Sequence, residues 1–481
     1  MHIRKSWLTA LAFLCLATGL QAQSKRYNVL VLFTDDQRFS TIHALNNPDI
    51  ITPNMDQLLK SGTCFTQAHI MGSLGGAVCA PSRAMLLSSR SVFHVHQDGG
   101  VIPPADITFP EYFRANGYQT FETGKWHSDY ASFNRSFGTG ENIFFGGMHT
   151  EKEGGHISPK LTHYDTTGAY KQRFQGEKFS SVMYADAAVQ FLQQQHTAPF
   201  LMYVAFTAPH DPRTPPAEYL SKYDTSKIPL PANFMTRHPF NNGEMDVRDE
   251  VLLGFPRNRD SVKMEIAKYY AMITEVDHEI GRVMDALRKS GQLENTIIVF
   301  AGDNGLAVGQ HGLLGKQNLY DHSMRVPLII AGPGIPANKR INAYCYLNDV
   351  FPTLCDLNHL STPASVEGQS LAKAFSSNNF KGRKEIFTTY SNLQRAITID
   401  SMKYILYNVN GAHPEQLFDL HNDPLEQHNL AAAPRYQQQV AAMRSKLFET
   451  MKFYNDFCDP TKPGWGYPEK LKWADALKIN P

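Results

Sequence analysis

Residues 27–37 read YNVLVLFTDDQ, a nearly unbroken apolar run that ends in two adjacent aspartates. A short, continuous apolar run with polar residues after it is typical of a strand buried on both faces. Sheets that are covered by helices on both sides contain such strands. The segment 27–34 is therefore predicted to be a buried strand, with Asp35 and Asp36 just beyond its carboxyl end.

The chain continues with the same alternation of patterns. Further strands are predicted at 117–123, 200–207, 296–301 and 327–331, and helices at 52–62, 110–116, 180–195 and 261–290. Strands that alternate with helices indicate the α/β class, with a large, mostly parallel sheet between layers of helices. Residues 128–178 and 211–260 lack periodicity, and we expect them to form long loops that wall a site.

The pattern changes near residue 380. Segments 396–400 and 403–408 read as a hairpin, and 434–453 reads as a last helix. We therefore expect three parts: a leader at 1–22, a main α/β domain at 23–380, and a smaller α+β subdomain with a short antiparallel sheet at 381–481.

Composition limits the possible functions. The chain has 481 residues, 46 basic and 45 acidic side chains, and 42% apolar residues. That apolar content is enough for a core and excludes disorder of the whole chain. A net charge of +1 gives no basic excess for a nucleic-acid partner. We expect a monomer or a weak oligomer.

The first 22 residues resemble a secretory signal peptide. Arg4 and Lys5 precede an apolar run at 8–20, and Ala22 supplies a small residue at the cleavage position. The mature protein is expected to be exported, most simply to a bacterial periplasm, without stable membrane insertion. A lipoprotein attached through Cys15, an extracellular protein and a membrane anchor are the alternatives.

Five cysteines remain once Cys15 is removed with the leader. So few in a long chain do not form a disulfide framework, and the absence of a CxxC pair argues against a structural zinc site. Cys345 with Cys355, or Cys64 with Cys458, could pair in an oxidising compartment.

Polar residues that could take part in binding or catalysis follow four of the predicted strands. Since parallel strands end at one edge of the sheet, these groups are expected to converge. Alone, each could be a helix cap or a turn, but four together favour a site. The oxygen donors suit Ca²⁺ or Mg²⁺, and the neighbouring lysines and histidines suit a tetrahedral anion, phosphate or sulfate. The oxygen donors are Asp35, Asp36, Asp303 and Asn304, and the cationic groups are Lys125, His127, His210 and Lys316.

A further motif, Cys79-Ala80-Pro81-Ser82-Arg83 followed by Leu87-Ser88-Ser89-Arg90, resembles the maturation motif of type I sulfatases. In that family the cysteine is oxidised to Cα-formylglycine by a maturation enzyme. Ser89 stands where the family usually has glycine. The resemblance continues, in the family's order, through residues 35–36, 117–127, 209–212, 303–305, 315–316, 352–354, 417–420 and 423–424.

The resemblance implies an alkaline-phosphatase-like sandwich fold and a set of residue roles. Asp35, Asp36, Asp303 and Asn304 would bind Ca²⁺, or Mg²⁺, with the modified Cys79 as a further ligand. The hydrated aldehyde at position 79 would attack the sulfate sulfur, so that covalent catalysis divides the reaction into two steps. Arg83 would activate it, Lys125 and Lys316 would bind sulfate, and His127 would be the base for sulfate elimination. His210, with Lys316, would bind substrate and protonate the leaving alcohol.

The substrate is expected to be a sulfated oligosaccharide, since relatives with this motif set include exported glycosaminoglycan sulfatases of gut bacteria. A uronate 2-O-sulfate of heparin, heparan or chondroitin fragments, cleaved in exo fashion, is the preferred prediction, and a hexosamine 6-O-sulfate is the alternative. A uronate would need cations for its carboxylate. The candidates in predicted loops are Arg38, His94, His96, Arg213, Arg237 and His238.

Two other functions stay open at this point. A phosphate or phosphonate monoester hydrolase could use the same metal ligands, although such sites often hold a second metal and this chain offers one oxygen-rich set. A non-catalytic sulfoglycan-binding protein would keep an unmodified thiol at Cys79. A zinc hydrolase lacks any supporting HxxxH spacing.

Overall fold

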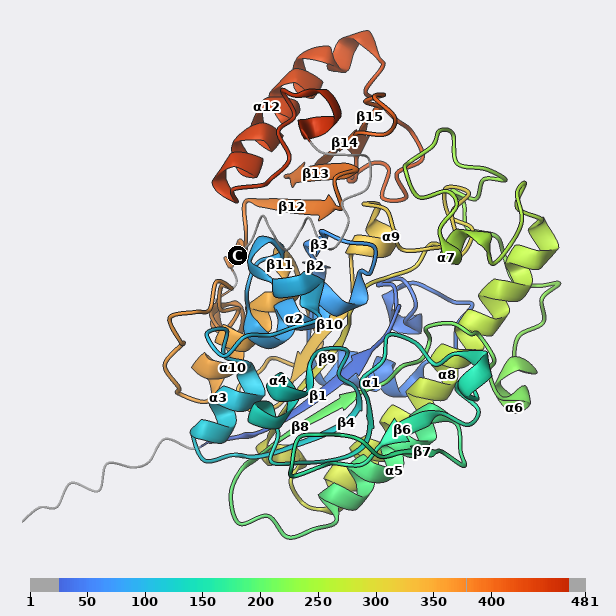
Figure 1. Cartoon of the computed structure of the whole chain (residues 1–481). Coiled ribbons are helices and arrows are strands. Elements are labelled where there is room, and N and C mark those ends of the chain that lie inside the picture. Colours follow the sequence, from blue (N-terminus) through green and yellow to red (C-terminus); the bar gives the residue numbers. More distant parts are fainter. Residues whose placement is uncertain (1–25, 378, 467–481) are drawn as a thin grey trace, which may run out of the picture.

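The computed structural model describes residues 26–377 and 379–466. The predicted leader at 1–22 lies outside these residues. Two sheets dominate the fold (Figure 1). The large sheet has ten strands, in the spatial order β11 (Lys339–Tyr346), β2 (Gly62–His69), β10 (Leu328–Ala331), β9 (Thr296–Gly302), β1 (Asn28–Thr34), β8 (Phe200–Ala205), β4 (Gln119–Lys125), β5 (Thr139–Phe144), β6 (Lys160–Thr162) and β7 (Arg173–Gln175).

The centre of the large sheet is parallel. Strands β9, β1, β8, β4 and β5 pair in parallel, whereas β10 runs antiparallel to both of its neighbours. Strands β6 and β7 add an antiparallel edge. The predicted large and mostly parallel sheet is therefore confirmed. The expectation that 128–178 is one long loop is wrong, because this segment supplies three strands and a helix.

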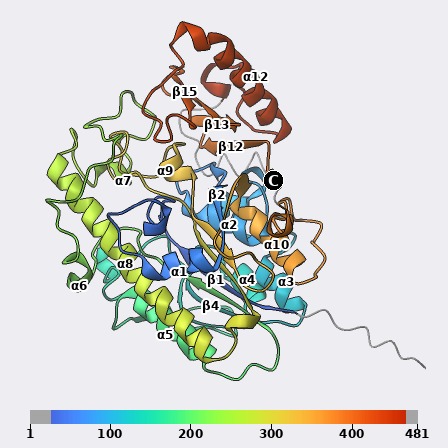
Figure 2. The ribbon, with the colours of Figure 1, turned by 180° about the vertical axis from the view of Figure 1, so that it is seen from behind.

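Helices cover both faces of this sheet (Figures 1 and 2). Leu30 and Leu32 of β1 pack into one core with α1, α5 and α8, and Val31 and Phe33 pack into the other with α2, α3, α4 and α10. Alternate side chains of one strand thus enter different cores, as a doubly covered strand requires. The helices are α1 (Pro53–Ser61), α2 (Cys79–Ser88), α3 (Phe109–Ala115), α4 (Tyr130–Ser136), α5 (Ser180–Leu192), α6 (Ala217–Leu220), α7 (Arg248–Val251), α8 (Arg259–Lys289), α9 (Asp321–Met324), α10 (Val350–Leu357), α11 (Lys373–Ser376) and α12 (Gln437–Phe453).

The smaller sheet lies in the carboxyl-terminal part, with α12 packed against it (Figure 1). Four antiparallel strands, β15 (Glu415–Asp419), β14 (Met402–Tyr407), β13 (Gln394–Ile399) and β12 (Glu385–Tyr390), are joined by β3 (Gly72–Ser73), which pairs in parallel with β12. The expected short antiparallel sheet is present. The edge strand β3 belongs to the segment just before Cys79. The small sheet is therefore attached directly to the polypeptide that enters α2.

Helix α2 ends at Ser89, whose φ of 57° is the left-handed conformation that usually selects glycine. The Ser89 hydroxyl donates to the Asn348 carbonyl at 2.5 Å and accepts from the Gly368 amide at 3.1 Å. These two bonds stabilise a serine at a position where glycine would avoid the backbone strain. All five cysteines in the described part are buried free thiols, so neither of the pairings considered from the sequence forms.

Candidate active site

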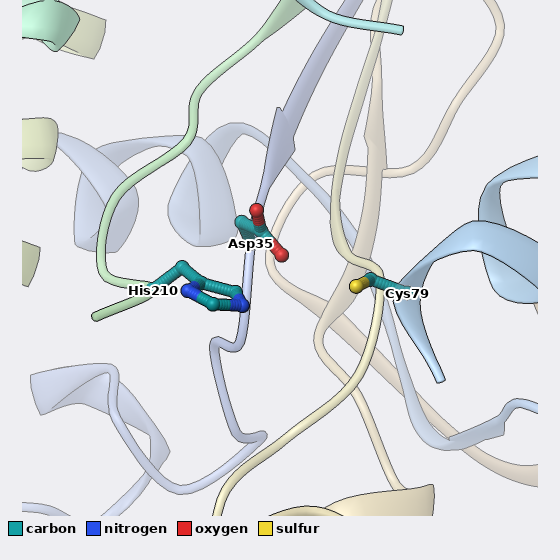
Figure 3. A group of neighbouring side chains, drawn as sticks. All are labelled: Asp35, Cys79 and His210. Carbon is teal, nitrogen blue, oxygen red and sulfur yellow. The ribbon is translucent and has the colours of Figure 1, made fainter. Parts of the chain in front are cut away.

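Four adjacent strands bring the predicted groups to one edge of the large sheet. Asp35 and Asp36 follow β1, Asp303 follows β9, Lys125 ends β4, and His210 lies in the loop after β8. Figure 3 shows Asp35 and His210 pointing toward the same space as Cys79, which begins α2. The expected convergence of these groups is thus what the parallel order β9-β1-β8-β4 produces.

Three buried carboxylates form the centre of this site. Oxygen atoms of Asp35, Asp36 and Asp303 lie within 4.8 Å of one another. Asp36 adopts a left-handed φ of 64°, and its amide donates to Asp303 Oδ1 at 3.0 Å. The Asn304 amide donates to the same oxygen at 2.8 Å. The turns after β1 and β9 are therefore bonded to each other, which holds the acidic groups in place.

The charges of this cluster are unevenly compensated. Burial and the neighbouring charge of Asp35 raise the pKa of Asp303 to about 6. Burial also acts to raise the pKa of Asp36, but the charges of His210 and Lys316 outweigh it and lower that pKa to about 2. The repulsion between the carboxylates of Asp303 and Asp35 favours a bound cation.

The donor set fits a hard divalent cation. Within the described residues, Asp35 Oδ1 and Asn304 Oδ1 are buried and have no hydrogen-bond partner. A buried oxygen without a partner carries a desolvation cost that a cation would remove. Carboxylate and amide oxygens suit Ca²⁺ or Mg²⁺. Asp35, Asp36, Asp303 and Asn304 could therefore hold such an ion, next to Cys79.

Two lysines lie against the Cys79 thiol. The Nζ atoms of Lys125 and Lys316 are each 3.7 Å from Sγ, and His127 forms a hydrogen bond with the same thiol. Burial alone would raise the pKa of Cys79, but the positive charges of the two lysines hold it well below its usual range. An anion at the position of Sγ is strongly favoured by this environment.

Arg83 connects helix α2, which begins at Cys79, to the acidic cluster. It stands four positions after Cys79, on the same face of α2. Its guanidinium lies 2.9 Å from Asp303 Oδ2 and 3.8 Å from Asp35 Oδ2, and it donates to the Lys125 carbonyl at 3.0 Å. The side chain is fully buried. Arg83 therefore fixes the beginning of α2 against β4 and the carboxylates.

The two histidines have opposite protonation preferences. Burial and the charge of Lys125 lower the pKa of His127 to about 4. Burial acts the same way on His210, but Asp36, whose Oδ2 lies 3.6 Å from Nε2, raises that pKa to about 9. At neutral pH the site thus contains a neutral imidazole at His127, suited to accept a proton. It also contains an imidazolium at His210, suited to donate one.

A cavity of about 510 Å³ opens over Cys79. His127, His210 and Lys316 line it on the side of the thiol. Gly76, Ala77, Gly147 and Met148 line it as well. Further lining residues that the sequence analysis did not identify come from the loop 211–260, from the position after Lys316 and from the end of β12 and the residue after it. These are Glu244, Val247, Arg248, Asp249, Gln317, Tyr390 and Ser391. The lack of periodicity in 211–260 indicated a wall, but no local pattern singled out its members.

None of the six loop residues considered for a uronate carboxylate lines this cavity. Arg38 is buried and donates to the carbonyls of Leu306 and Ala307. The other candidates are held by partners elsewhere: His94 by Glu367, His96 by Asp106, Arg213 by Glu265, Arg237 by the ring of Phe255, and His238 by Tyr320 and the Phe240 carbonyl. That part of the sequence interpretation is not supported.

Comparison with known proteins identifies the family to which the chain is similar. Residues 27–360 match the family model described as sulfatase, and residues 309–452 match that of the N-sulphoglucosamine sulphohydrolase C-terminal region. An arylsulfatase of Clostridium perfringens is 28% identical, with 92% of this chain and 98% of that protein covered. An N-acetylglucosamine-6-O-sulfatase of Bacteroides thetaiotaomicron is 25% identical, with 93% and 90% covered.

The fold is shared with solved structures. One, described in complex with its substrate D-glucosamine-2-N,6-O-disulfate, superposes with a TM-score of 0.74 at 24% identity, covering 92% of this chain and all of that one. The expected alkaline-phosphatase-like architecture, with its large mixed sheet and its smaller carboxyl-terminal sheet, is therefore confirmed.

Proposed function

Because the chain belongs to the sulfatase family and is a sulfuric ester hydrolase, we propose that it removes sulfate from sulfated carbohydrates, acting in exo fashion on glycosaminoglycan oligosaccharides. The observation that carries this proposal is the pair of ammonium groups, Lys125 and Lys316, each 3.7 Å from Sγ of Cys79 beside a cluster of three carboxylates. A relative that is 25% identical is named as an N-acetylglucosamine-6-O-sulfatase, which supports a sugar sulfate as the substrate.

Residue 79 is the proposed nucleophile after oxidation of Cys79 to formylglycine by a maturation enzyme. The aldehyde, when hydrated, would supply a hydroxyl nucleophile and a second hydroxyl for its own regeneration. Asp35, Asp36, Asp303 and Asn304 would hold Ca²⁺, or Mg²⁺, which would supply positive charge beside the sulfate. The two buried oxygens without partners support this assignment.

The chain's own side chains would then divide the remaining work. Lys125 and Lys316 bind the sulfate oxygens, and Arg83 holds residue 79 against the carboxylates. His127, neutral at physiological pH, accepts a proton from residue 79. His210 donates a proton to the leaving sugar oxygen. The pKa values of about 4 and about 9 support these two roles.

Organisation and location follow the sequence interpretation and are proposals too. The catalytic part would span 23–380 and the smaller part 381–481, with β3 and β12 joining them. Export to a bacterial periplasm would place the enzyme with extracellular glycans. No helix in the described residues is both long enough and apolar enough to cross a membrane.

The test is sulfate release from disaccharides that each carry one sulfate, at uronate O2, hexosamine O6, hexosamine O4 or nitrogen. The peptide 61–83 is weighed first to establish an aldehyde at residue 79. We expect turnover of at least one member and little hydrolysis of the matching phosphate or phosphonate esters. If the aldehyde form hydrolyses the phosphorus esters faster than the sulfate esters, the protein is a phosphate or phosphonate monoester hydrolase and the proposed sulfatase activity is wrong.

A further inference from the structure

A second cavity adjoins the cavity over Cys79. Its volume is about 660 Å³, and Met148 and Arg248 line both cavities. The loop after β8 leads from one to the other, since His210 lines the first cavity and Arg213 lines the second. Three residues of extended chain span at most about 11 Å. One small oligosaccharide could therefore contact both His210 and Arg213.

Arg213 brings unused hydrogen-bond donors to the second cavity. Only 3% of its side chain is exposed, and its Nε donates to Glu265 Oε2 at 2.9 Å. Among the described residues, neither of its Nη groups has a hydrogen-bond partner. A buried guanidinium with free donors carries a desolvation cost that acceptor oxygens of a ligand would remove. Two adjacent Nη groups match two oxygens of a carboxylate or of a sulfate.

The wall of the second cavity contains one more cation than carboxylates. The cations are Lys152, Arg213, Arg248 and Lys268, and the carboxylates are Glu151, Asp211 and Glu265. Glu265 pairs with two of the cations, because Lys268 Nζ lies 2.9 Å from its Oε1 while Arg213 bonds to its Oε2. The single charge of Glu265 therefore does not neutralise both Arg213 and Lys268.

Asp211, the carboxylate nearest to Arg213 along the chain, is paired with other cations. His210 Nδ1 lies 3.2 Å from its Oδ1, and Arg248 Nη2 donates to the same oxygen at 2.8 Å. The same Nη2 lies 2.9 Å from Asp249 Oδ1, so Arg248 is itself shared by two carboxylates. The charge of Arg213 also acts on Asp211, but no hydrogen bond joins these two described side chains. The free donors of this wall are therefore those of Arg213, not those of Arg248.

We propose that the second cavity binds an anionic group, a carboxylate or a sulfate, on the sugar next to the one that carries the hydrolysed sulfate. Arg213 supplies the paired donors. Lys268, which uses one of its three ammonium donors on Glu265, supplies a second cation. This inference rests on the proposed sulfatase activity and adds a second anion site to it. The preferred substrate is then at least a disaccharide with an anionic group on each sugar.

The experiment compares kcat/KM for pairs of disaccharides that carry the hydrolysed sulfate at the same position and differ only in the neighbouring sugar. In one pair the neighbour is a uronate or the same sugar with its carboxyl group reduced to the alcohol. In the other pair it is a hexosamine with or without a 6-sulfate. Loss of the first sulfate is followed by mass and chromatography. Ratios from a single preparation do not depend on the fraction of residue 79 that is matured.

We expect the charged member of one pair to be preferred about tenfold, because a charge-assisted hydrogen bond contributes about 1.5 to 3 kcal/mol. The preference should lie in KM, since a group remote from the reacting sulfate is bound equally in the ground state and in the transition state. The pair that shows the preference identifies the anion as a carboxylate or as a sulfate.

Variants Arg213→Gln and Lys268→Gln test the two cations. Arg213→Gln should remove most of the preference, and Lys268→Gln should remove part of it, because each loses a charged donor. Arg282→Gln is the matched control and should keep the wild-type preference. Arg282 also pairs with carboxylates, those of Asp186 and Glu279, but it lines neither cavity. Melting temperatures of all variants establish that they fold.

Two results would overturn the inference and leave the sulfatase chemistry in place. One is equal kcat/KM for the two members of both pairs in the wild-type enzyme. The other is a preference that folded Arg213→Gln and Lys268→Gln proteins both retain in full, since other groups would then bind the anion. An aldehyde form that hydrolyses no sulfate ester would remove the proposed function and this inference together.

Discussion

The Nζ atom of Lys316 lies 3.7 Å from Sγ of Cys79, although 237 positions separate the two residues along the chain. Lys125 approaches the same sulfur at the same distance. Each lysine is also tied to an aspartate, Lys316 to Asp36 and Lys125 to Asp35. The aspartates fix the ammonium groups before any substrate binds, so the site is preorganised for an anion at the position of residue 79.

Replacement of Cys79 by alanine should abolish sulfate ester hydrolysis, because no group at position 79 can then attack sulfur. The wild-type peptide 61–83 should have the mass of an aldehyde in place of the thiol when the protein is produced with its maturation enzyme. Cys355→Ala is the matched control, since Cys355 is a buried thiol in α10. Equal turnover by Cys79→Ala and wild type would exclude residue 79 as the nucleophile.

Chelation of divalent cations should inactivate the enzyme, and Ca²⁺ should restore it. Added Ca²⁺ should also raise the melting temperature, since an ion bound only by the folded state stabilises by about 2.7 kcal/mol at a hundredfold excess over Kd. Asp303→Asn should lose that shift, because a member of the carboxylate cluster is gone. Asp106→Asn, a buried aspartate that pairs with Arg90, should keep it. The same shift in both variants would argue against this site.

The pH profile of kcat/KM should be bell-shaped. The proposed roles require neutral His127, whose pKa is about 4, and protonated His210, whose pKa is about 9. Activity should therefore fall below about pH 4 and again at alkaline pH, no higher than the value of about 9 that His210 has when no cation is bound. Because Asp36 is the charge that raises the pKa of His210, a cation bound at Asp36 should move the alkaline limb to lower pH. An alkaline limb that persists unchanged in His210→Gln would show that another group causes it.

Two variants separate the roles of the histidines. His210→Gln should slow hydrolysis of a sugar sulfate by about 10²-fold or more, and slow an aryl sulfate much less, since a phenolate leaves without protonation. His127→Gln should release about one equivalent of the leaving alcohol per enzyme and then stop, if His127 serves only the second step. Continued turnover by His127→Gln at the wild-type rate would assign the base elsewhere.

The strands that could be predicted from the sequence are those whose residues are almost all apolar, because they are buried on both faces. Apolar runs located β1, β8 and β9, and the polar groups of the candidate site directly after these strands could be identified with them. Strands β2 and β11 were missed because their sequences, GTCFTQAH and KRINAYCY, mix polar and apolar residues. Pairing with a neighbour, rather than local composition, stabilises such strands. Strands β5, β6 and β7, at one end of the large sheet, were missed for the same reason.

The residues that line the cavity over Cys79 from the loop 211–260 and from β12 were the least predictable part of the site. Glu244 and Asp249 lie in a segment without periodicity, and Tyr390 reaches the cavity only because β12 pairs with β3 next to Cys79. These positions depend on tertiary contacts between distant segments. Asp35, Asp36, Asp303 and His210 could be found because each closely follows a predicted strand, whereas Cys79, Arg83 and Lys316 were found by their resemblance to family motifs.

Asp98 should make stability depend on pH. It is buried, accepts hydrogen bonds from the Ser73 hydroxyl at 3.0 Å and the Leu74 amide at 3.3 Å, and burial raises its pKa to about 7. The folded state therefore holds a proton that the unfolded state releases between about pH 4 and pH 7. Stability must fall as pH rises through that window, by about 2 to 3 kcal/mol between pH 5 and pH 8.

Urea unfolding of Asp98→Asn at both pH values checks this. The variant should lose most of that difference, because it has no carboxyl group to titrate. Asp285→Asn, at an exposed position of α8, should behave as wild type. A wild-type protein that is equally stable at pH 5 and pH 8 would contradict the assignment.

Lys403 should be essential for stability, because it joins the small sheet to the segment that carries Lys316. Its Nζ lies 2.7 Å from both Asp321 Oδ1 and Glu426 Oε1, and only 3% of its side chain is exposed. The Asp321 amide in turn donates to Glu426 Oε2 at 2.8 Å. Lys403→Met would leave two buried carboxylates without their cation, which typically costs about 3 to 5 kcal/mol.

The free energy of unfolding, from urea titration at pH 7, is the measurement. Lys452→Met, at an exposed position of α12, is the matched control and should stay within about 0.5 kcal/mol of wild type. Adding Asp321→Asn to Lys403→Met should recover part of the loss, because one of the two uncompensated charges is removed. A Lys403→Met protein as stable as Lys452→Met would mean that the carboxylates take up protons at little cost and that the cation is dispensable there.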